Sequence, residues 1–446
     1  MSIEESFAGD RSGAAAPEVE PEPESAGALS PDAVACPAFG AASAAARPAS
    51  LALSFGIEEE FFLVDPSTRD LMPAVPKDFL RECRLRFGNA VQDELQRPQL
   101  ETATPVQHST AGAREALFAL REGVGRIARA ANMRLVASGT HPLAAWEIQE
   151  HTSRPRYDRL IDDYQIVGRR SLLCGLHVHV GIPQGIDRVA LMNRLMPWVP
   201  VFLALSTSSP FWSGHRTGLL SYRQSAYDEW PRSGVPDAFA DEREYASFVD
   251  LLRRCGTLDD GSFLWWAIRP SSRYPTLELR IADACTHTED ALALASAFRC
   301  LVRAHLRLPR LGVVRTALAR RVIDENRWRA KRFGTQAAFI DEQQRENAPF
   351  GASLRRMLDL LAPDAEALRC EREMAHLAAI PARGTSAQLQ LAIYRRERVR
   401  GVPHQDALAK VVDWLAATTD AAPGAIAERK RLTLPAAQDA ACVVNA

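Results

Sequence analysis

Three segments of the sequence alternate apolar and ionisable side chains at the two-residue period of a β-strand. They read FGIEEEFFLVD (55–65), GLHVHVG (175–181) and PTLELRI (275–281). Because residues i and i+2 of a strand point to the same face, the side chains that share a polar face are Glu58 with Glu60, His177 with His179, and Glu278 with Arg280. Glu101 interrupts QLETATP (99–105) in the same manner. We therefore predict a sheet whose polar face lines a cavity.

The carboxylates on these segments predict a divalent cation. Glu58 and Glu60 repel each other, and burying both is costly unless a cation compensates their charge. A lone Glu-x-Glu is more typical of a solvent-facing strand edge, but the recurrence of ionisable faces favours a cavity. Ligation by oxygen with one or two histidines suits Mg²⁺ or Mn²⁺ better than Zn²⁺. Since Mg²⁺ bridges protein carboxylates and substrate phosphates, a nucleotide is the expected ligand.

Two arginines are candidates to interact with the phosphates of that nucleotide. Arg280, on the third segment, can stabilise a transferring phosphoryl group. Arg269, in WWAIRP (265–270), is the second candidate, although a structural ion pair with a neighbouring glutamate explains it equally well. We expect Trp265 and Trp266 to lie in the core rather than to form an adenine platform.

The basic residues limit how the chain can hold a nucleotide. The only lysines are Lys77, Lys331, Lys410 and Lys430, and none follows a glycine, which excludes a G-K-[ST] phosphate loop. Arginine, metal and backbone N–H groups are then left to hold the phosphates. The formal net charge of -1 and the pI near 6.8 give no general case for nucleic acid or an anionic membrane as a partner.

The cysteines and the first residues predict a cytoplasmic protein. The 8 cysteines are scattered without a C-x-x-C pair, as expected of reduced thiols. Cys174, beside the histidine segment, is expected to be a packing residue and not a nucleophile. Glu4, Glu5 and Asp10 stand where a signal peptide would carry positive charge, and no apolar run is judged long enough to span a membrane.

Composition divides the chain into a tail, one domain and a second tail. Residues 1–48 are rich in Ala, Pro, Glu and Ser, which predicts a disordered acidic tail. Residues 49–430 are predicted to form a single catalytic domain. Residues 431–446 are predicted to be a flexible C-terminal tail.

Apolar spacing predicts the secondary structure of the domain. Helical spacing runs over 111–134 and 189–206, with a short strand expected at 134–138 between them. Thr288 is the expected cap of a helix that begins a mostly helical C-terminal third. Because no regular βαβ alternation is visible, we predict an α+β fold with a largely antiparallel sheet flanked by helices.

Taken in order, the segments resemble the glutamate–cysteine ligase type 2 family, and within it the carboxylate-amine ligase (YbdK) subfamily. The matching segments are 55–65, 99–105, 139–142, 175–181, 221–223, 230–234, 268–270, 275–281 with Asp283, and 325–328. The resemblance implies a glutamine-synthetase-like sheet. On it, ATP would phosphorylate a carboxylate, and an amine would attack the acyl phosphate to give an amide, ADP and phosphate.

The resemblance also implies roles for residues that match the family. The implied metal ligands are Glu58, Glu60, Glu101, His177 and Glu278. Arg280 would face the transferred phosphate as the catalytic residue, and Arg269 and Asn326 would join it in binding substrate or nucleotide. His179 stands where related ligases often have a different polar residue, so its role stays open.

The implied partners are ATP, Mg²⁺ or Mn²⁺, a small carboxylate and an amine, with neither nucleic acid nor membrane, and a homodimer as one expected assembly. The subfamily name implies a weak glutamate–cysteine ligase activity, but nothing in the sequence selects cysteine as the amine. Two other interpretations stay open. One is a metal-dependent hydrolase that uses His177-x-His179, and the other is a nucleotide-binding module without catalysis.

Overall fold

A computed structural model describes residues 51–312, 316–342, 344–419 and 421. The predicted tails, 1–48 and 431–446, lie outside the described residues. All described residues belong to one of two units of the chain, Arg47–Ala446.

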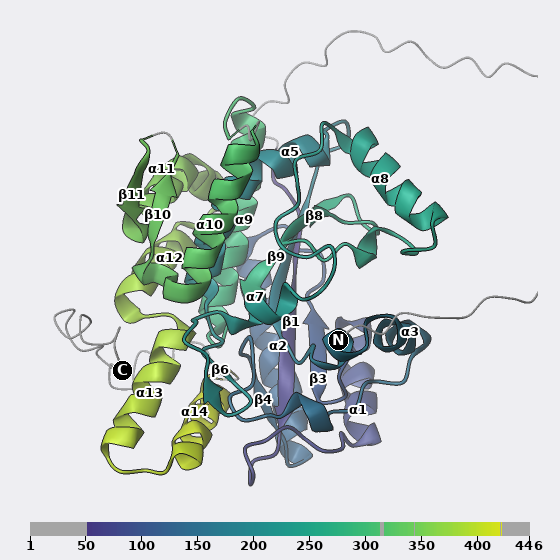
Figure 1. Ribbon diagram of the computed structural model, residues 1–446, viewed down its shortest axis with the longest axis vertical. Coiled ribbons are helices and arrows are strands. Elements are labelled where there is room, and N and C mark those ends of the chain that lie inside the picture. Colours follow the sequence, from purple (N-terminus) through teal and green to yellow (C-terminus); the bar gives the residue numbers. More distant parts are fainter. Residues whose placement is uncertain (1–50, 313–315, 343, 420, 422–446) are drawn as a thin grey trace, which may run out of the picture. The chain divides into compact units, whose positions relative to one another are not determined.

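The centre of the fold is a seven-stranded sheet with the order β2-β3-β1-β5-β9-β8, to which β4 adds by pairing with β1. Its strands are β1 (Phe55–Val64), β2 (Val91–Asp93), β3 (Gln99–Ala103), β4 (Arg134–Val136), β5 (Gly175–Gly181), β8 (Ile268–Pro270) and β9 (Thr276–Asp283). Every pairing in this sheet is antiparallel. The segments whose alternation predicted strands are thus β1, β5 and β9, neighbours in the middle of the sheet (Figure 1).

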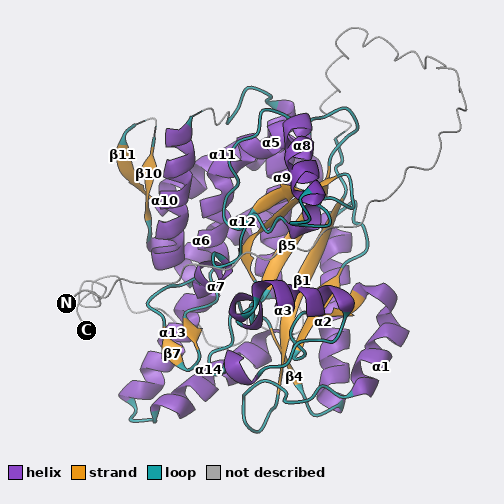
Figure 2. Cartoon of the chain, turned by 45° about the vertical axis from the view of Figure 1, so that its right-hand side comes forward, coloured by secondary structure: helices purple, strands orange, loops and turns teal. Residues whose placement is uncertain are grey.

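Helices cover the apolar face of the sheet. Ile57 of β1, Val178 of β5 and Leu279 of β9 are buried in one core cluster with the apolar side of α9 (Thr288–Arg307). The long helix α2 (Thr110–Ala130) packs against β1, β4 and α9. Figure 2 shows the strands lying among these helices. The alternation in the strands therefore predicted correctly which face is buried.

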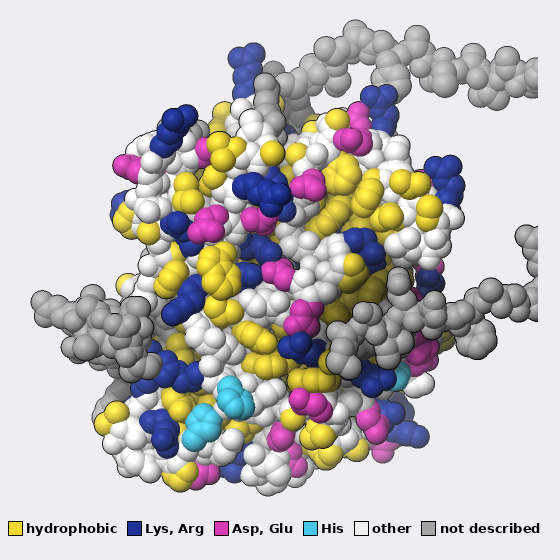
Figure 3. Space-filling view, in the orientation of Figure 1, with side chains coloured by type: hydrophobic (Ala, Val, Ile, Leu, Met, Phe, Trp, Pro, Cys, Tyr) yellow, Lys and Arg dark blue, Asp and Glu magenta, His cyan; other side chains and the backbone are white. Residues whose placement is uncertain are grey.

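The remaining helices lie around this core, and most of the C-terminal third is helical, as predicted. They are α1 (Lys77–Phe87), α3 (Pro155–Tyr164), α4 (Ile166–Arg169), α5 (Arg188–Leu195), α6 (Val199–Ser206), α7 (Tyr222–Tyr227), α8 (Glu242–Arg254), α10 (Ala317–Phe333), α11 (Phe350–Leu368), α12 (Glu371–Arg383), α13 (Ser386–Val399) and α14 (His404–Thr419). Two hairpins, β6–β7 (Phe211–Trp212, His215–Arg216) and β10–β11 (Ala338–Asp341, Glu346–Pro349), were not predicted from the sequence. Charged side chains of both signs are interspersed over one face of the molecule (Figure 3).

The start of α9 differs from the prediction by one residue. The residue that caps the helix is His287, with φ -87 and ψ 126, and its side chain makes no capping bond. Thr288 is the first helical residue, followed by Glu289 and Asp290 in the first turn, where acidic side chains favour the helix dipole. The sequence pattern predicted the helix correctly. The first helical residue is set by backbone angles, which the spacing of apolar residues does not predict.

One helical segment of the described residues, Arg188–Ser206, is long and apolar enough to cross a membrane by length and composition. This corrects the expectation that no run reaches that length. Of its most apolar stretch, 72% is buried inside the protein. Core helices pass the same test, so the segment is weak evidence for a membrane span.

A β-bulge in β9 changes which face its last residues occupy. Leu176 of β5 pairs with Ala282, whereas Val178 pairs with Leu279, so Arg280 and Ile281 together face the single residue between them on β5. A bulge of this kind reverses the alternation beyond it. Asp283 therefore lies opposite Gly175, on the polar face of the sheet.

Candidate functional site

The strand register brings the predicted site residues together in a row across the sheet. The facing pairs are Glu60 with Glu101, Glu58 with His177, His179 with Glu278, and Glu278 with Arg269. Directly opposed side chains of an antiparallel sheet lie close together. Residues from β3, β1, β5, β9 and β8 thus meet on one face.

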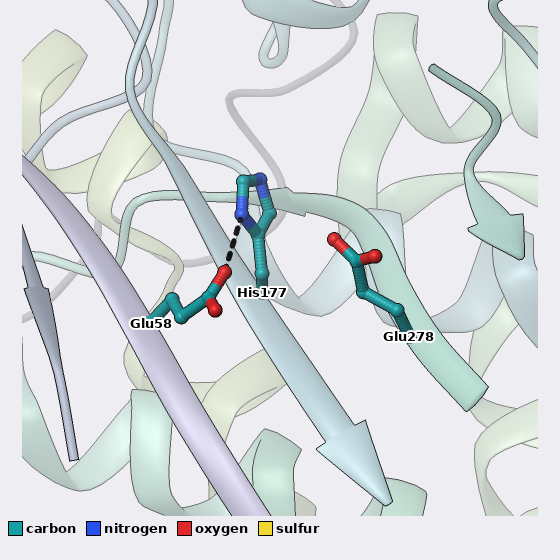
Figure 4. Close-up of side chains that lie close together, drawn as sticks. All are labelled: Glu58, His177 and Glu278. Atoms are coloured by element: carbon teal, nitrogen blue, oxygen red, sulfur yellow. Dashed lines mark ion pairs between the residues drawn. The ribbon is translucent and has the colours of Figure 1, made fainter. Parts of the chain in front are cut away.

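Glu58, His177 and Glu278 form the tightest group in this row. One ligand atom from each lies within 4.8 Å of the others, a spacing that can hold a metal ion. Nδ1 of His177 is 3.4 Å from Oε2 of Glu58. Figure 4 shows the three side chains, each from a different strand, converging on a common space. His179 lies beside the group, with its Nε2 3.4 Å from Oε1 of Glu58 and its Nδ1 3.0 Å from Oγ1 of Thr276.

Glu60 and Glu101 extend the cluster toward β3. Oε2 of Glu60 accepts a hydrogen bond of 2.6 Å from the backbone N–H of Gly175, and its Oε1 is 3.7 Å from Nε2 of His177. Glu94, in the loop after β2, lies close enough to Glu101 to raise the pKa of that carboxyl. All five predicted metal ligands therefore lie in one region.

A cavity of about 280 Å³ lies over this part of the row. Its polar side includes Glu58, Glu60, Glu101, His177 and Arg280. Aromatic rings also line the cavity, and they belong to Tyr157, Tyr227, Trp230 and Trp265. A cavity lined by charged groups and aromatic rings can hold a small charged substrate.

The carboxyl groups of the row differ in pKa. Burial and the charge of Glu94 raise the pKa of Glu60 to about 7. Burial and the charge of Glu58 raise the pKa of Glu101 well above its ordinary value. For Glu58, burial alone would raise the pKa, but hydrogen bonds from His177 and His179 outweigh burial and lower it. Burial is likewise outweighed at Glu278, whose pKa is lowered by Arg269 and Arg280.

These residues fit a divalent cation. Burial and the charge of Arg280 lower the pKa of His177 to about 4, so this imidazole is neutral near pH 7 and can act as a ligand. Its Nε2 is buried and has no hydrogen-bond partner among the described residues. Carboxylate oxygens lie at both ring nitrogens, Glu58 at Nδ1 and Glu60 at Nε2, and a set of carboxylates with one histidine matches the ligand preference of Mg²⁺ or Mn²⁺.

The raised pKa of Glu60 predicts a pH-dependent effect of Mg²⁺ on stability. A carboxyl whose pKa is higher in the folded state stabilises the fold only when protonated, and this contribution is lost as pH rises from 4.5 through about 7. Mg²⁺ binds the ionised form, so we expect it to raise the melting temperature more at pH 8 than at pH 6. Thermal denaturation with and without Mg²⁺, against Na⁺ at matched ionic strength, measures this. An equal or smaller shift at pH 8 would contradict the assignment.

Arg280 points into the cavity and is held from two sides. It donates to Oε1 of Glu278 through Nη1 and to the hydroxyl of Tyr227 through Nη2 at 3.2 Å. Its Nε is buried without a partner among the described residues. The guanidinium therefore keeps the Nε–H, among other donors, for a further group.

Arg269 also reaches the cavity, but other contacts occupy its guanidinium. Its Nε lies 2.8 Å from Oε2 of Glu278, and its Nη1 donates to the carbonyls of Ser262 and Leu264 at 2.9 and 2.6 Å. This is the structural ion pair that the sequence left open as an alternative.

Asn326 is not brought to the row. It lies on α10 and does not line the cavity. Its amide donates to the carbonyl of Ile340 at 3.0 Å and accepts from the N–H of the same residue at 2.7 Å, so it fastens β10 to α10.

Arg223 is a cavity residue to which the sequence assigned no role. Arg223 is 2% exposed, its Nη1 donates to the carbonyl of Ala282 at 3.1 Å, and its Nε has no partner among the described residues. A Cβ at Gly175 would stand 2.3 Å from Nη2 of Arg223, so glycine is needed there for the arginine to approach. The segment 221–223 was a signal for this residue, whereas the loop that holds Glu94 offered none.

Three other predictions from the sequence concern neighbouring residues. Trp266 packs among Phe239, Tyr245 and Phe248 as a core residue. Trp265 packs on Trp230 and also lines the cavity. Burial raises the pKa of the Cys174 thiol well above its ordinary value, which agrees with a packing role.

The chain is similar to one protein family over most of its length. The model of glutamate-cysteine ligase family 2 matches residues 54–412. Three relatives carry the name "Putative glutamate--cysteine ligase 2". One from Ectopseudomonas mendocina is 45% identical over 83% of this chain and 98% of the relative. Those from Bradyrhizobium diazoefficiens and Rhodospirillum rubrum are 40% and 43% identical, each over 84% of this chain and over 86% and 97% of the relative.

Two solved structures share the fold. The bifunctional glutathione synthetase from Pasteurella multocida has a TM-score of 0.62 and 15% identity, over 82% of this chain and 52% of that chain. The chain thus spans about half the length of that protein. Glutamate–cysteine ligase from Francisella tularensis, solved in complex with AMP, has a TM-score of 0.62 and 12% identity, over 83% of this chain and 89% of that chain. At these identities the likeness shows the fold alone.

The comparisons agree with the predicted fold and family. The antiparallel sheet with flanking helices is the architecture that these ligases share. The chain belongs to glutamate–cysteine ligase family 2 and is, as predicted, an ATP-dependent carboxylate-amine ligase.

Proposed function

We propose that the chain forms an amide in two steps at the cavity over β1, β5 and β9. ATP first phosphorylates the carboxylate of one substrate, and the amine of a second substrate then displaces phosphate. A free carboxylate is a poor acyl donor because its leaving group would be oxide, whereas an acyl phosphate loses phosphate. The protein then needs no covalent nucleophile, in keeping with the buried, protonated Cys174.

The observation that carries this proposal is the convergence of carboxylates and a neutral histidine on one face of the sheet. We assign Glu58, His177 and Glu278 as the first ligands of Mg²⁺ or Mn²⁺, supported by their spacing within 4.8 Å. Glu60 and Glu101 complete the ligand set. When bound, the cation neutralises phosphate charge and aligns the donor with the acceptor.

The arginines of the cavity are proposed to bind the anionic groups. Arg280 has an unpaired Nε and lies beside the ligand cluster, so we assign it to the transferred phosphoryl group. Arg223 is the second buried arginine with an unpaired Nε at the cavity, and we assign it to a substrate carboxylate or phosphate. Arg269 is assigned to holding Glu278 in place, because its bonds to Glu278 and to two carbonyls occupy its guanidinium.

The identity of the substrates is a separate proposal. We expect a small carboxylate and a small amine, given the names of the relatives. Glutamate and cysteine are therefore the first pair to test. We also propose a cytoplasmic protein, since the cysteines of the described residues are free thiols. The single catalytic domain and the homodimer stay predictions.

A screen of ADP release tests the function. Purified protein with Mg²⁺ and ATP is offered single carboxylates, each with and without an amine acceptor. We expect ADP release that requires a carboxylate and rises when an amine is added, together with a new amide in the product. Hydroxylamine serves as a general acceptor that traps an acyl phosphate. ATP binding without carboxylate-dependent ADP release, or hydrolysis in the absence of ATP, would overturn the proposal.

A further inference from the structure

The middle carboxylate of the Glu58–Glu60 run faces away from the site. Glu59 is 2% exposed and lies on the opposite face of β1 from its two neighbours. Its charge is balanced by Arg121 of α2 and not by a metal ion. Nε of Arg121 donates to Oε2 of Glu59 at 3.0 Å, and Nη2 donates to Oε1 at 2.5 Å. Arg121 is 1% exposed, so this ion pair is fully buried.

Arg121 joins three separate parts of the chain. Besides Glu59, its guanidinium donates to the carbonyl of Cys285 at 2.7 Å, of Thr286 at 2.9 Å and of Thr419 at 3.1 Å. These bonds occupy all the N–H donors that an arginine side chain has. They tie β1 to the chain just beyond β9 and to the end of α14.

The segment beyond β9 is fastened further. Oγ1 of Thr286 donates to the carbonyl of Ala137 at 2.8 Å, and the N–H of Ala137 donates to Oγ1 of Thr419 at 2.9 Å. The connections therefore run from β1 across to the ends of β9, β4 and α14.

The position of this network relates it to the site. Glu59 stands between Glu58 and Glu60 on β1, while Cys285 and Thr286 follow the strand that carries Glu278 and Arg280. Strands β1 and β9 are not neighbours, since β5 lies between them. Through Arg121, the network thus links β1, on its apolar side, to the chain just beyond β9, and the polar sides of these two strands carry most of the cluster.

We infer that Arg121 is a positioning residue, which together with Glu59 sets the spacing between the carboxylates of β1 and the Glu278–Arg280 pair of β9. The charge pair itself is not needed for stability, because a buried ion pair can often be exchanged for apolar residues of similar volume. The exchange also removes the donor of three carbonyls, so we expect some loss of stability and a shift of the segment beyond β9. This role rests on the proposed metal site.

The test exchanges the pair for apolar residues and measures metal binding without nucleotide. The first variant combines Glu59→Leu with Arg121→Met. The second variant, Arg121→Lys, keeps the positive charge but loses the planar guanidinium with its five donors. The control is Arg303→Met with Asp364→Leu, a buried ion pair between α9 and α11 that Arg307 joins and whose residues do not line the cavity. Free Mn²⁺ is followed by electron paramagnetic resonance, and folding by thermal denaturation.

We expect both Arg121 variants to weaken Mn²⁺ binding by about tenfold or more, the size found for residues that orient metal ligands. The control is expected to bind Mn²⁺ as the wild type does, even where its melting temperature falls equally. Unchanged Mn²⁺ affinity in a folded Arg121 variant would overturn the positioning role alone. Wild-type protein that binds no Mn²⁺ would overturn the proposed metal site, and this inference with it.

Discussion

Replacing Glu58 with glutamine is expected to reduce ADP release by about a thousandfold while leaving the fold intact. Glu58 is the carboxylate that joins both histidines, since its oxygens lie 3.4 Å from His177 and 3.4 Å from His179. Its lowered pKa means that it is ionised, so the substitution removes a full charge from the cluster. Glutamine has the same shape, and the uncharged amide relieves repulsion in the absence of metal.

Steady-state kinetics over a range of Mn²⁺ concentrations measures this effect. We expect the half-saturating Mn²⁺ concentration to rise and the melting temperature to stay within a few degrees of the wild type. The control is Glu122→Gln on α2, where the side chain is 59% exposed and, among the described residues, pairs with Arg126 alone. Wild-type turnover in the Glu58 variant would remove this residue from the metal site.

The row of site residues could be predicted because its signal is local. Alternation within β1, β5 and β9 showed which side chains share a face without any knowledge of the neighbouring strands. The register between strands was out of reach, since it depends on which strands become neighbours. That Glu58 faces His177 while Glu278 faces His179 is therefore known only from the fold.

Residues that act through long-range contacts were missed for the same reason. The bulge that places Asp283 on the polar face is a property of two paired strands. Arg121 lies on α2, whose apolar residues follow a regular helical spacing. Nothing in the sequence of this helix therefore predicts that an arginine is buried among its core residues. Its partners are up to 298 positions away in the sequence.

Motif resemblance placed some residues in the right segment without giving their contacts. Asn326 stands in a matching motif, yet both atoms of its amide bond to the backbone of Ile340. Arg269 stands in another, and its guanidinium holds Glu278 and two carbonyls. A segment can match a family because its residues maintain the fold or because they bind a ligand. Only the side-chain contacts in the structure distinguish these two roles.

Changing Arg280 to lysine is expected to lower turnover by about a hundredfold or more, with little change in the KM for ATP. The planar guanidinium spans from Glu278 to the Tyr227 hydroxyl and still has Nε unpaired. An ammonium group is a point charge that cannot hold both partners and also face a third group, so phosphoryl transfer loses its stabilising contact while the nucleotide still binds.

Single-turnover measurement of ADP formation, beside the melting temperature, separates this effect from loss of structure. The control is Arg299→Lys, because Arg299 is an arginine with 1% exposure, against 13% for the side chain of Arg280, and it donates to the carbonyls of Leu53 and His108 without lining the cavity. We expect the control to lose stability and keep the rate of the chemical step. If the Arg280 variant and the wild type form ADP at equal single-turnover rates, Arg280 has only the structural role of pairing with Glu278. Arg223 would then be the arginine assigned to the transferred phosphoryl group.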